Sequence, residues 1–308
     1  MSSTMTDQTV VVAVAPPRDA GLWTERTTSV GRYLRRNPPL MLGLLLLFGL
    51  LLFVVIGSFM VDLDRARPLS ARALQPPGGS LPFGSDKQGR DLFAVMVAGT
   101  PLTLRIGLIA GFIGTIFGAT LAFVSAYYGG AVDNIIRGIV DIGLTVPGLM
   151  VLILIAMNLK GGLSVDQMAL IVASLAWLFP ARTIRSQVLT IKERSYVQIA
   201  RLSGVSGPEI IVKELLPNLL PYMVASLVGS VSAAILASIG LAVLGLGPTE
   251  SPDLGMTLYW VLYNAAIING WWWWWVPPIV AIAVLFIGLF LVTVGLDEIA
   301  NPRLRQQV

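Results

Sequence analysis

Long apolar stretches alternate with shorter polar segments along most of the chain. A helix needs about 20 mainly apolar residues to cross the hydrocarbon core of a membrane, because each residue adds about 1.5 Å to a path of about 30 Å. Six stretches are candidates for such helices, and the fourth is the shortest of them and needs its flanks through Arg182. They are residues 40–61, 102–127, 135–157, 168–180, 222–246 and 277–296. The pattern predicts an all-α membrane protein with six transmembrane helices.

The charges between these spans predict their orientation. Lysine and arginine collect in cytosolic segments. With the amino terminus inside, the inside segments hold 14 of these residues and the outside segments hold 6. Both termini are therefore expected in the cytosol. The predicted organisation is a cytosolic tail over residues 1–39, a first transmembrane helix over 40–61, an extracytoplasmic loop over 62–101, a domain with the other five spans over 102–297, and a cytosolic tail over 298–308.

Composition excludes several classes of function. Hydrophobic residues make up 55% of the 308 residues and charged residues only 12%, whereas soluble proteins carry about 25% charged residues. The net charge is +4, but a mean hydropathy of +0.78 leaves too little solvated surface for a nucleic-acid-binding protein. The chain has no histidine and no cysteine, which removes the usual zinc ligands and the Ser-His and Cys-His catalytic pairs. We expect no catalytic residue, no metal site and no nucleic-acid partner.

Two pairs of glycines lie four residues apart in the second predicted span. They are Gly107 with Gly111 and Gly114 with Gly118. Small residues at this spacing allow a neighbouring helix to approach closely. The neighbour is either another helix of this chain or a helix of a partner subunit, and the pattern leaves both alternatives open.

The polar segment between the fourth and fifth spans begins with a predicted short helix. Residues 196–204 have helical periodicity, with Val197 and Ala200 on one side. Gly204 is placed to end this helix, because glycine adopts the left-handed conformation without a clash at Cβ.

A second helix is predicted directly after this turn. Ser206 can cap it, Glu209 can complete a capping box, and Pro208 falls in the first turn, where its missing N–H costs nothing. The helix is expected to end at Pro217. The two helices would form a hairpin along the cytosolic face of the membrane.

This hairpin resembles the EAA loop of permease subunits of ABC importers, in which a short helix docks into a cleft of the cytosolic ATPase. The loop reads YVQIARLSGVSGPEIIVKELLPNLLP, with Gly204 and the Leu216-Pro217 pair at the family's spacing. Gln198 and Ile199 stand where the family usually has glutamate and alanine, so the resemblance implies docking without a salt bridge from residue 198. It implies a coupling segment over residues 194–217. The ATPase-coupling residues that it implies are Tyr196, Gln198, Ala200, Arg201, Gly204, Leu216 and Pro217.

Other motifs are similar to the dipeptide and oligopeptide branch of these permeases. They are LPFGSDKQGRDLF at 81–93, YYGGAVDNIIRGIVDIGLTVPGL at 127–149, LAVLGLG at 241–247 and NPRLR at 301–305. The resemblance implies the fold of a type I ABC importer permease, which forms half of a pore for di- or oligopeptides in the inner membrane, in contact with its lipid. It implies as partners a homologous second permease subunit, two cytosolic ATPase subunits that bind ATP and Mg, and an extracytoplasmic binding protein. The chain itself is expected to bind no cofactor, and it contains no G-x-x-x-x-G-K-[ST] phosphate loop.

Charged residues in the loop and the spans have open roles. Asp86, Arg90 and Asp91 either contact the binding protein or hold the turn of their loop. Asp141 either pairs with Arg137, four residues before it on the same helical face, or lines the translocation path.

Two other classes of membrane protein compete with this interpretation. A secondary transporter or channel would use intramembrane charges such as Asp141 and Arg105. An aspartyl intramembrane protease would need two apposed carboxylates, but Asp141 is the single acidic residue well inside a predicted span.

Overall fold

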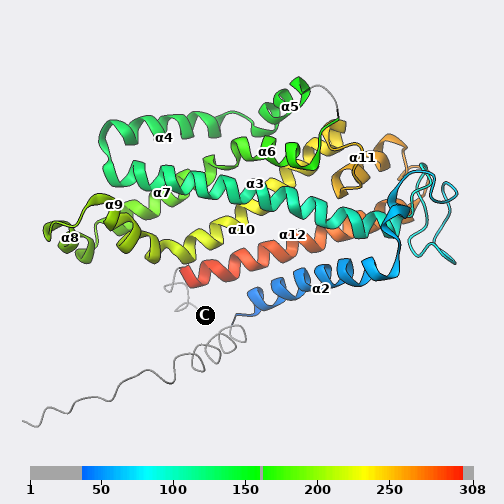
Figure 1. The fold of residues 1–308 in the computed structure, drawn as a ribbon, viewed down its shortest axis with the longest axis horizontal. Helices are drawn as coiled ribbons and strands as arrows, with labels where there is room; N and C mark the ends of the chain where they lie inside the picture. Colours follow the sequence, from blue (N-terminus) through cyan, green and yellow to red (C-terminus); the bar gives the residue numbers. More distant parts are fainter. Residues whose placement is uncertain (1–36, 160–161, 301–308) are drawn as a thin grey trace, which may run out of the picture. The chain divides into compact units, whose positions relative to one another are not determined.

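The computed structural model describes residues 37–159 and 162–300, and all the regular elements within them are helices (Figure 1). The contacts divide the chain into Met1–Pro38 and Pro39–Val308, and the fold described here is that of the second unit. The predicted tails at 1–39 and 298–308 lie mostly outside the described residues. The helices are α2 (Pro38–Met60), η1 (Leu63–Ala66), α3 (Leu92–Tyr128), α4 (Gly130–Thr145), α5 (Gly148–Asn158), α6 (Val165–Ala176), α7 (Leu178–Lys192), α8 (Ser195–Leu202), α9 (Gly207–Ile210), η2 (Ile211–Leu215), α10 (Leu216–Leu241), η3 (Ala242–Leu246), α11 (Leu254–Tyr263) and α12 (Trp272–Ala300).

Six segments of the described chain are apolar and long enough to cross a membrane. Four are single long segments, namely α2, α3, Gly207–Leu246 and Trp272–Glu298. The other two are bent pairs, in which α4 with α5 and α6 with α7 each count as one span. The prediction of an all-α membrane protein with up to six spans is confirmed.

The third predicted span is broken in the middle. Between α4 and α5 the axis bends by 85°. The cause is Pro147, which has no backbone N–H to donate and which disfavours the helical conformation at the residue before it. Val146 is accordingly extended, with φ −77° and ψ 132°. The span predicted at 135–157 is therefore two helices joined by a bend rather than one continuous helix.

Two further spans differ from their predicted bounds. The helix α3 begins at Leu92 rather than at residue 102, because the side chain of Asp91 caps it by accepting from the backbone N–H of Phe93. Pro101 lies inside this 37-residue helix. The fourth span continues through the polar flank to Lys192, with a bend of 41° between α6 and α7.

The long helix α3 forms the centre of the fold, and α10, α7 and α6 pack against it (Figure 1). Its glycines allow these contacts. A Cβ atom at Gly111 would lie 2.7 Å from the backbone N of Val231 in α10, and one at Gly118 would lie 2.6 Å from the backbone O of Trp177 beside α7. The glycine pairs therefore pack against helices of the same chain, which decides between the two alternatives left open by the sequence.

The tryptophan run at 271–275 covers the start of α12 and contacts the loop at 62–91. Trp274 is fully buried, and the indole Nε1 of Trp273 donates to the backbone O of Ser85 at 3.3 Å. The run thus packs against the loop that precedes α3.

Candidate functional site

The predicted turn between the two short helices is present after α8. Gly204 has φ +81°, in the left-handed region. The N–H of Gly204 donates to Arg201 O at 3.1 Å, and the N–H of Val205 donates to Ala200 O at 3.2 Å. These bonds satisfy the last carbonyl groups of α8. The left-handed position predicted for Gly204 is confirmed. We call residues 194–217 the coupling hairpin.

The second arm of the coupling hairpin differs from the prediction. Ser206 occupies the cap position of α9 but its side chain makes no capping bond, and Glu209 pairs instead with Lys213 at 2.6 Å. The helix does not end at Pro217, which lies in the first turn of α10, where a proline is tolerated. The arm continues through η2 into α10 and thus into the fifth span.

The inner face of the coupling hairpin is part of the membrane domain's core. Val197, Ile210 and Leu215 are fully buried. They form one cluster with residues of α7 and α3, which are Ile184, Val188, Ala119, Ala122, Phe123 and Ala126, and with Leu219 of α10. The hairpin is therefore packed directly against three spans.

The outer face of the hairpin exposes apolar side chains. Ile199 is 63% exposed, Leu202 88% and Val212 59%. Exposed apolar side chains, where they form a continuous patch, are typical of a surface that docks a partner.

The predicted coupling residues are divided between the two faces. Tyr196, Arg201, Gly204 and Pro217 are exposed, whereas Gln198, Ala200 and Leu216 are partly buried. Burial, assisted by the negative charge of Glu214, raises the pKa of Tyr196. Its phenol therefore stays neutral at physiological pH.

Two residues outside the predicted set hold the end of α3 to its neighbours, Lys192 as the last residue of α7 and Tyr127 against the hairpin. The Nζ of Lys192 donates to Ala126 O at 2.7 Å, and Tyr127 packs against the hairpin, where a Cβ at Gly207 would lie 2.9 Å from its ring. Tyr127 belongs to the YYGG motif at the end of the second span, and this motif is the sequence feature that could have indicated its role.

Asp86, Arg90 and Asp91 hold the turns of the loop before α3. Asp86 and Arg90 are buried and form a salt bridge of 2.5 Å between Oδ2 and Nε. Asp91 is fully buried, caps α3 and lies 3.2 Å from Arg65. Of the two roles left open by the sequence, the geometry supports the structural one. Contact of this loop with a binding protein stays a prediction. Because the three residues are buried, that contact would be made by the loop surface whose shape they hold.

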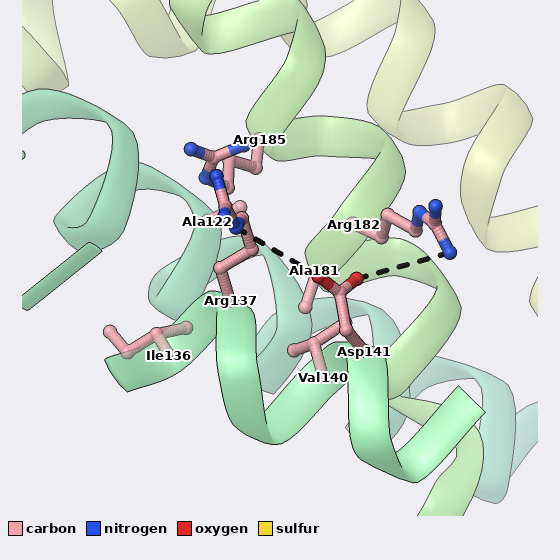
Figure 2. Close-up of a pocket in the computed structure, with 8 residues that line it drawn as sticks. All are labelled: Ala122, Ile136, Arg137, Val140, Asp141, Ala181, Arg182 and Arg185. Carbon is pink, nitrogen blue, oxygen red and sulfur yellow. Dashed lines mark ion pairs between the residues drawn. The ribbon is translucent and has the colours of Figure 1, made fainter. Parts of the chain in front are cut away.

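Asp141 lies beside a cavity of about 270 Å³ between α3, α4 and α7 (Figure 2). It pairs with Arg137 at 3.8 Å, as the spacing predicts, and also with Arg182 at 4.0 Å. The sequence did not reveal Arg182 or the neighbouring pair of Arg185 and Asp133, because these partners come from helices far apart in the chain.

Other intramembrane charges are separate from this cavity. Arg105 pairs with Asp166 at 2.8 Å, and it lies about 25 Å along α3 from Ala122 in the cavity wall. Within the described residues no group of three or more His, Cys, Asp or Glu side chains could hold a metal ion.

These features define a multi-pass membrane protein, with a helical hairpin that is packed into its spans and exposed on its outer face. Residues 114–306 match the family model of the binding-protein-dependent transport system inner membrane component. The chain belongs to this family and is the permease subunit of an ABC importer.

Two relatives and one solved structure are similar to it. The chain is 31% identical over 283 residues to the dipeptide transport system permease protein of Bacillus subtilis (strain 168), covering 91% of this chain and 87% of that one. It is 32% identical over 183 residues to the oligopeptide transport system permease protein of Mycobacterium tuberculosis (strain ATCC 25618 / H37Rv), covering 59% of this chain and 62% of that one. An inward-facing structure of the MetNI methionine ABC transporter aligns with a TM-score of 0.53 and 22% identity, over 68% of this chain and 96% of that chain. This last similarity concerns the fold, which is that of a type I importer permease.

Proposed function

We propose that this chain forms half of the translocation pore of an ATP-driven importer for di- or oligopeptides. The observation that carries the proposal is the coupling hairpin, whose inner face is buried among three spans and whose outer face exposes Ile199, Leu202 and Val212. A surface of this kind suits an ATPase subunit that moves the spans by moving the hairpin. The peptide substrate is proposed from the relatives named above, which are dipeptide and oligopeptide transport permeases.

The proposed complex contains a homologous second permease subunit, two cytosolic ATPase subunits and an extracytoplasmic binding protein. The chain has no phosphate-binding loop of the G-x-x-x-x-G-K-[ST] type, so ATP and Mg would bind to the ATPase subunits. The coupling residues are Tyr196, Gln198, Ala200, Arg201, Gly204, Leu216 and Pro217. Asp86, Arg90 and Asp91 would support the surface that receives the binding protein.

The proposed location is the inner membrane, with both termini and the coupling hairpin in the cytosol. The excess of lysine and arginine in the inside segments supports this orientation.

The proposed mechanism is alternating access. ATP binding draws the two ATPase subunits together, and each carries its docked hairpin with it. Because the hairpin packs against α3, α7 and α10, those helices follow as a rigid body, and the pore changes between inward-open and outward-open states. Release of the peptide and hydrolysis of ATP return the complex to its first state.

Reconstitution tests this function directly. The four kinds of subunit are purified from the source organism's own complex and placed in liposomes with ATP inside, and uptake of labelled dialanine is measured. Uptake should require ATP, the binding protein and this chain. Uptake by this chain without ATPase subunits, driven by a proton or sodium gradient, would contradict the proposal and support a secondary transporter.

A further inference from the structure

The charges around the cavity of Figure 2 do not balance. Three guanidinium groups, those of Arg137, Arg182 and Arg185, face two carboxylates, those of Asp133 and Asp141. Arg185 donates to both oxygens of Asp133, at 2.6 and 2.5 Å, and Asp133 also accepts from the hydroxyl of Ser125. This pair is therefore satisfied, and the excess charge belongs to Arg137 and Arg182.

Asp141 is shared loosely between these two arginines. Its distances to Arg137 Nε and Arg182 Nη1 are 3.8 and 4.0 Å, longer than the 2.7–3.2 Å of an N–H···O hydrogen bond. Figure 2 shows the two side chains approaching Asp141 from α4 and from α7. In the part of the chain that the structure describes, neither guanidinium group donates a hydrogen bond to a protein oxygen.

The three charged side chains of this cavity are largely exposed, and they lie on helix pairs that each count as one span. Arg137 and Asp141 lie about 10 and 16 Å along α4 from its first residue, at a rise of 1.5 Å per residue. The side chains of Arg137, Asp141 and Arg182 are 58%, 48% and 63% exposed. Charged side chains within a span face water or protein rather than hydrocarbon.

We propose that Arg137 and Arg182 form a transit site for a carboxylate, which is the free carboxyl terminus of a peptide that passes through the pore. The inference rests on the proposed function for the source of the carboxylate. The cavity of about 270 Å³ has room for one end of a peptide, and the small side chains of Ala122 and Ala181 leave its wall open. Guanidinium groups are well suited to carboxylates because each presents paired N–H donors in a plane.

Asp141 explains why such a site would not trap its ligand. It holds both arginines in place when the cavity is empty, and it competes with an arriving carboxylate for the same donors. A site on a transport path must bind strongly enough to admit the ligand and weakly enough to release it.

Chemical protection tests the site in the assembled complex in nanodiscs. Phenylglyoxal modifies exposed arginines, and mass spectrometry measures the modification of each. Dialanine and N-acetyl-dialanine, which carry a carboxylate, should both lower the modification of Arg137 and Arg182. Dialanine amide should not, and Arg105 in the same sample should be unaffected. Equal protection by the amide, or no protection, would overturn the proposal.

Other occupants of the cavity give different results. If protection depends on anionic lipid in the nanodisc and not on the peptide, the site binds a headgroup. If Arg137 and Arg182 are unreactive in the complex whatever is added, a carboxylate of the partner permease fills the cavity. Either outcome overturns the transit site.

Transport by matched variants is the second measurement. Arg182→Gln should lower dialanine uptake about tenfold, as expected for the loss of one charge-assisted interaction, whereas Arg105→Gln should not. Loss of the partner subunits from purified Arg182→Gln would assign the residue to assembly and overturn the proposal. If the complex transports no peptide but dialanine still protects both arginines, the proposed function fails and the carboxylate site stands.

Discussion

The guanidinium group of Arg201 lies over the ring of Tyr127, with 5.5 Å between Cζ and the ring centroid. Arg201 is on α8 of the coupling hairpin and Tyr127 is near the end of α3, so this contact joins the hairpin to the central helix of the membrane domain. Cation–π contacts at exposed sites contribute about 0.5–1 kcal/mol.

This contact predicts a role for the ring of Tyr127 in coupling. Tyr127→Leu removes the ring and should lower the number of peptides transported per ATP hydrolysed. The expected decrease is about two- to fivefold, which corresponds to the loss of the ~0.5–1 kcal/mol of the cation–π contact. Tyr127→Phe keeps the ring and serves as the control. The measurement is the ratio of uptake to hydrolysis in proteoliposomes. An unchanged ratio in Tyr127→Leu would show that the buried cluster around Val197, Ile210 and Leu215 couples the hairpin to the spans without this contact.

Substitutions of Gly204 are predicted to be tolerated when the new residue adopts the left-handed backbone conformation, whatever the size of its side chain. A Cβ at this position has nothing within 4 Å, so the cost of a substitution comes from φ +81°. Gly204→Val should cost about 1–2 kcal/mol in the hairpin and lower the amount of ATPase subunit that co-purifies, whereas Gly204→Asn should retain it, because asparagine adopts the left-handed conformation readily. Equal retention by both variants would contradict the assigned turn.

The close packing of α3 against α10 predicts a stability difference between two glycines. Gly111→Ala places a methyl group 2.7 Å from backbone N of Val231, which cannot move as a side chain can. Overpacking of this kind costs about 1–3 kcal/mol and should lower the melting temperature in detergent by several degrees. Gly229→Ala in α10 is the control, because a Cβ there has nothing within 4 Å. A melting temperature of Gly111→Ala equal to that of the control would refute this packing.

Asp253 predicts a pH dependence of stability. It caps α11 by accepting from the N–H groups of Gly255 and Met256, and its burial raises its pKa from 3.8 to about 6. Because the folded state then binds the proton more tightly than the unfolded state, this residue's contribution to stability falls as the pH rises from about 4 to 6.

Asp253→Asn removes the titrating group and keeps an oxygen to accept both N–H groups. The free energy of unfolding of the variant, relative to the unmodified chain, should rise by about 1–3 kcal/mol between pH 4 and pH 8. Denaturant unfolding at several pH values measures it. A constant difference over this range would show that the carboxyl group of Asp253 keeps its ordinary pKa.

Apolar runs predict the existence of the spans well, because each span must be apolar over its whole length. Their bounds are less predictable. Pro147 breaks the third span whereas Pro101 is accommodated inside α3, and the sequence around each does not separate the two cases. The second arm of the hairpin extends past Pro217 because the π-helical turn of η2 directly before α10 accommodates a residue that has no N–H to donate.

The candidate sites depend on pairs of charged residues that only the folded chain brings together. Asp133 and Arg185 are 52 residues apart and meet only because α4 and α7 pack together. The burial of Asp86 and Arg90 follows in the same way from the fold of the loop. By contrast, the left-handed turn at Gly204 is local and was predictable from the residues around it.

Photo-crosslinking from the coupling hairpin tests the central claim most directly. The chain has no cysteine, so Leu202→Cys and Ile268→Cys, each at a site 88% exposed, can be labelled singly with benzophenone maleimide in the assembled complex. Ile268 lies between α11 and α12, away from the hairpin, and is the matched control. Leu202→Cys should crosslink to an ATPase subunit, with a yield that changes when ATP is added, and Ile268→Cys should not. If Leu202→Cys crosslinks only to lipid or to the second permease, the hairpin is not the coupling element.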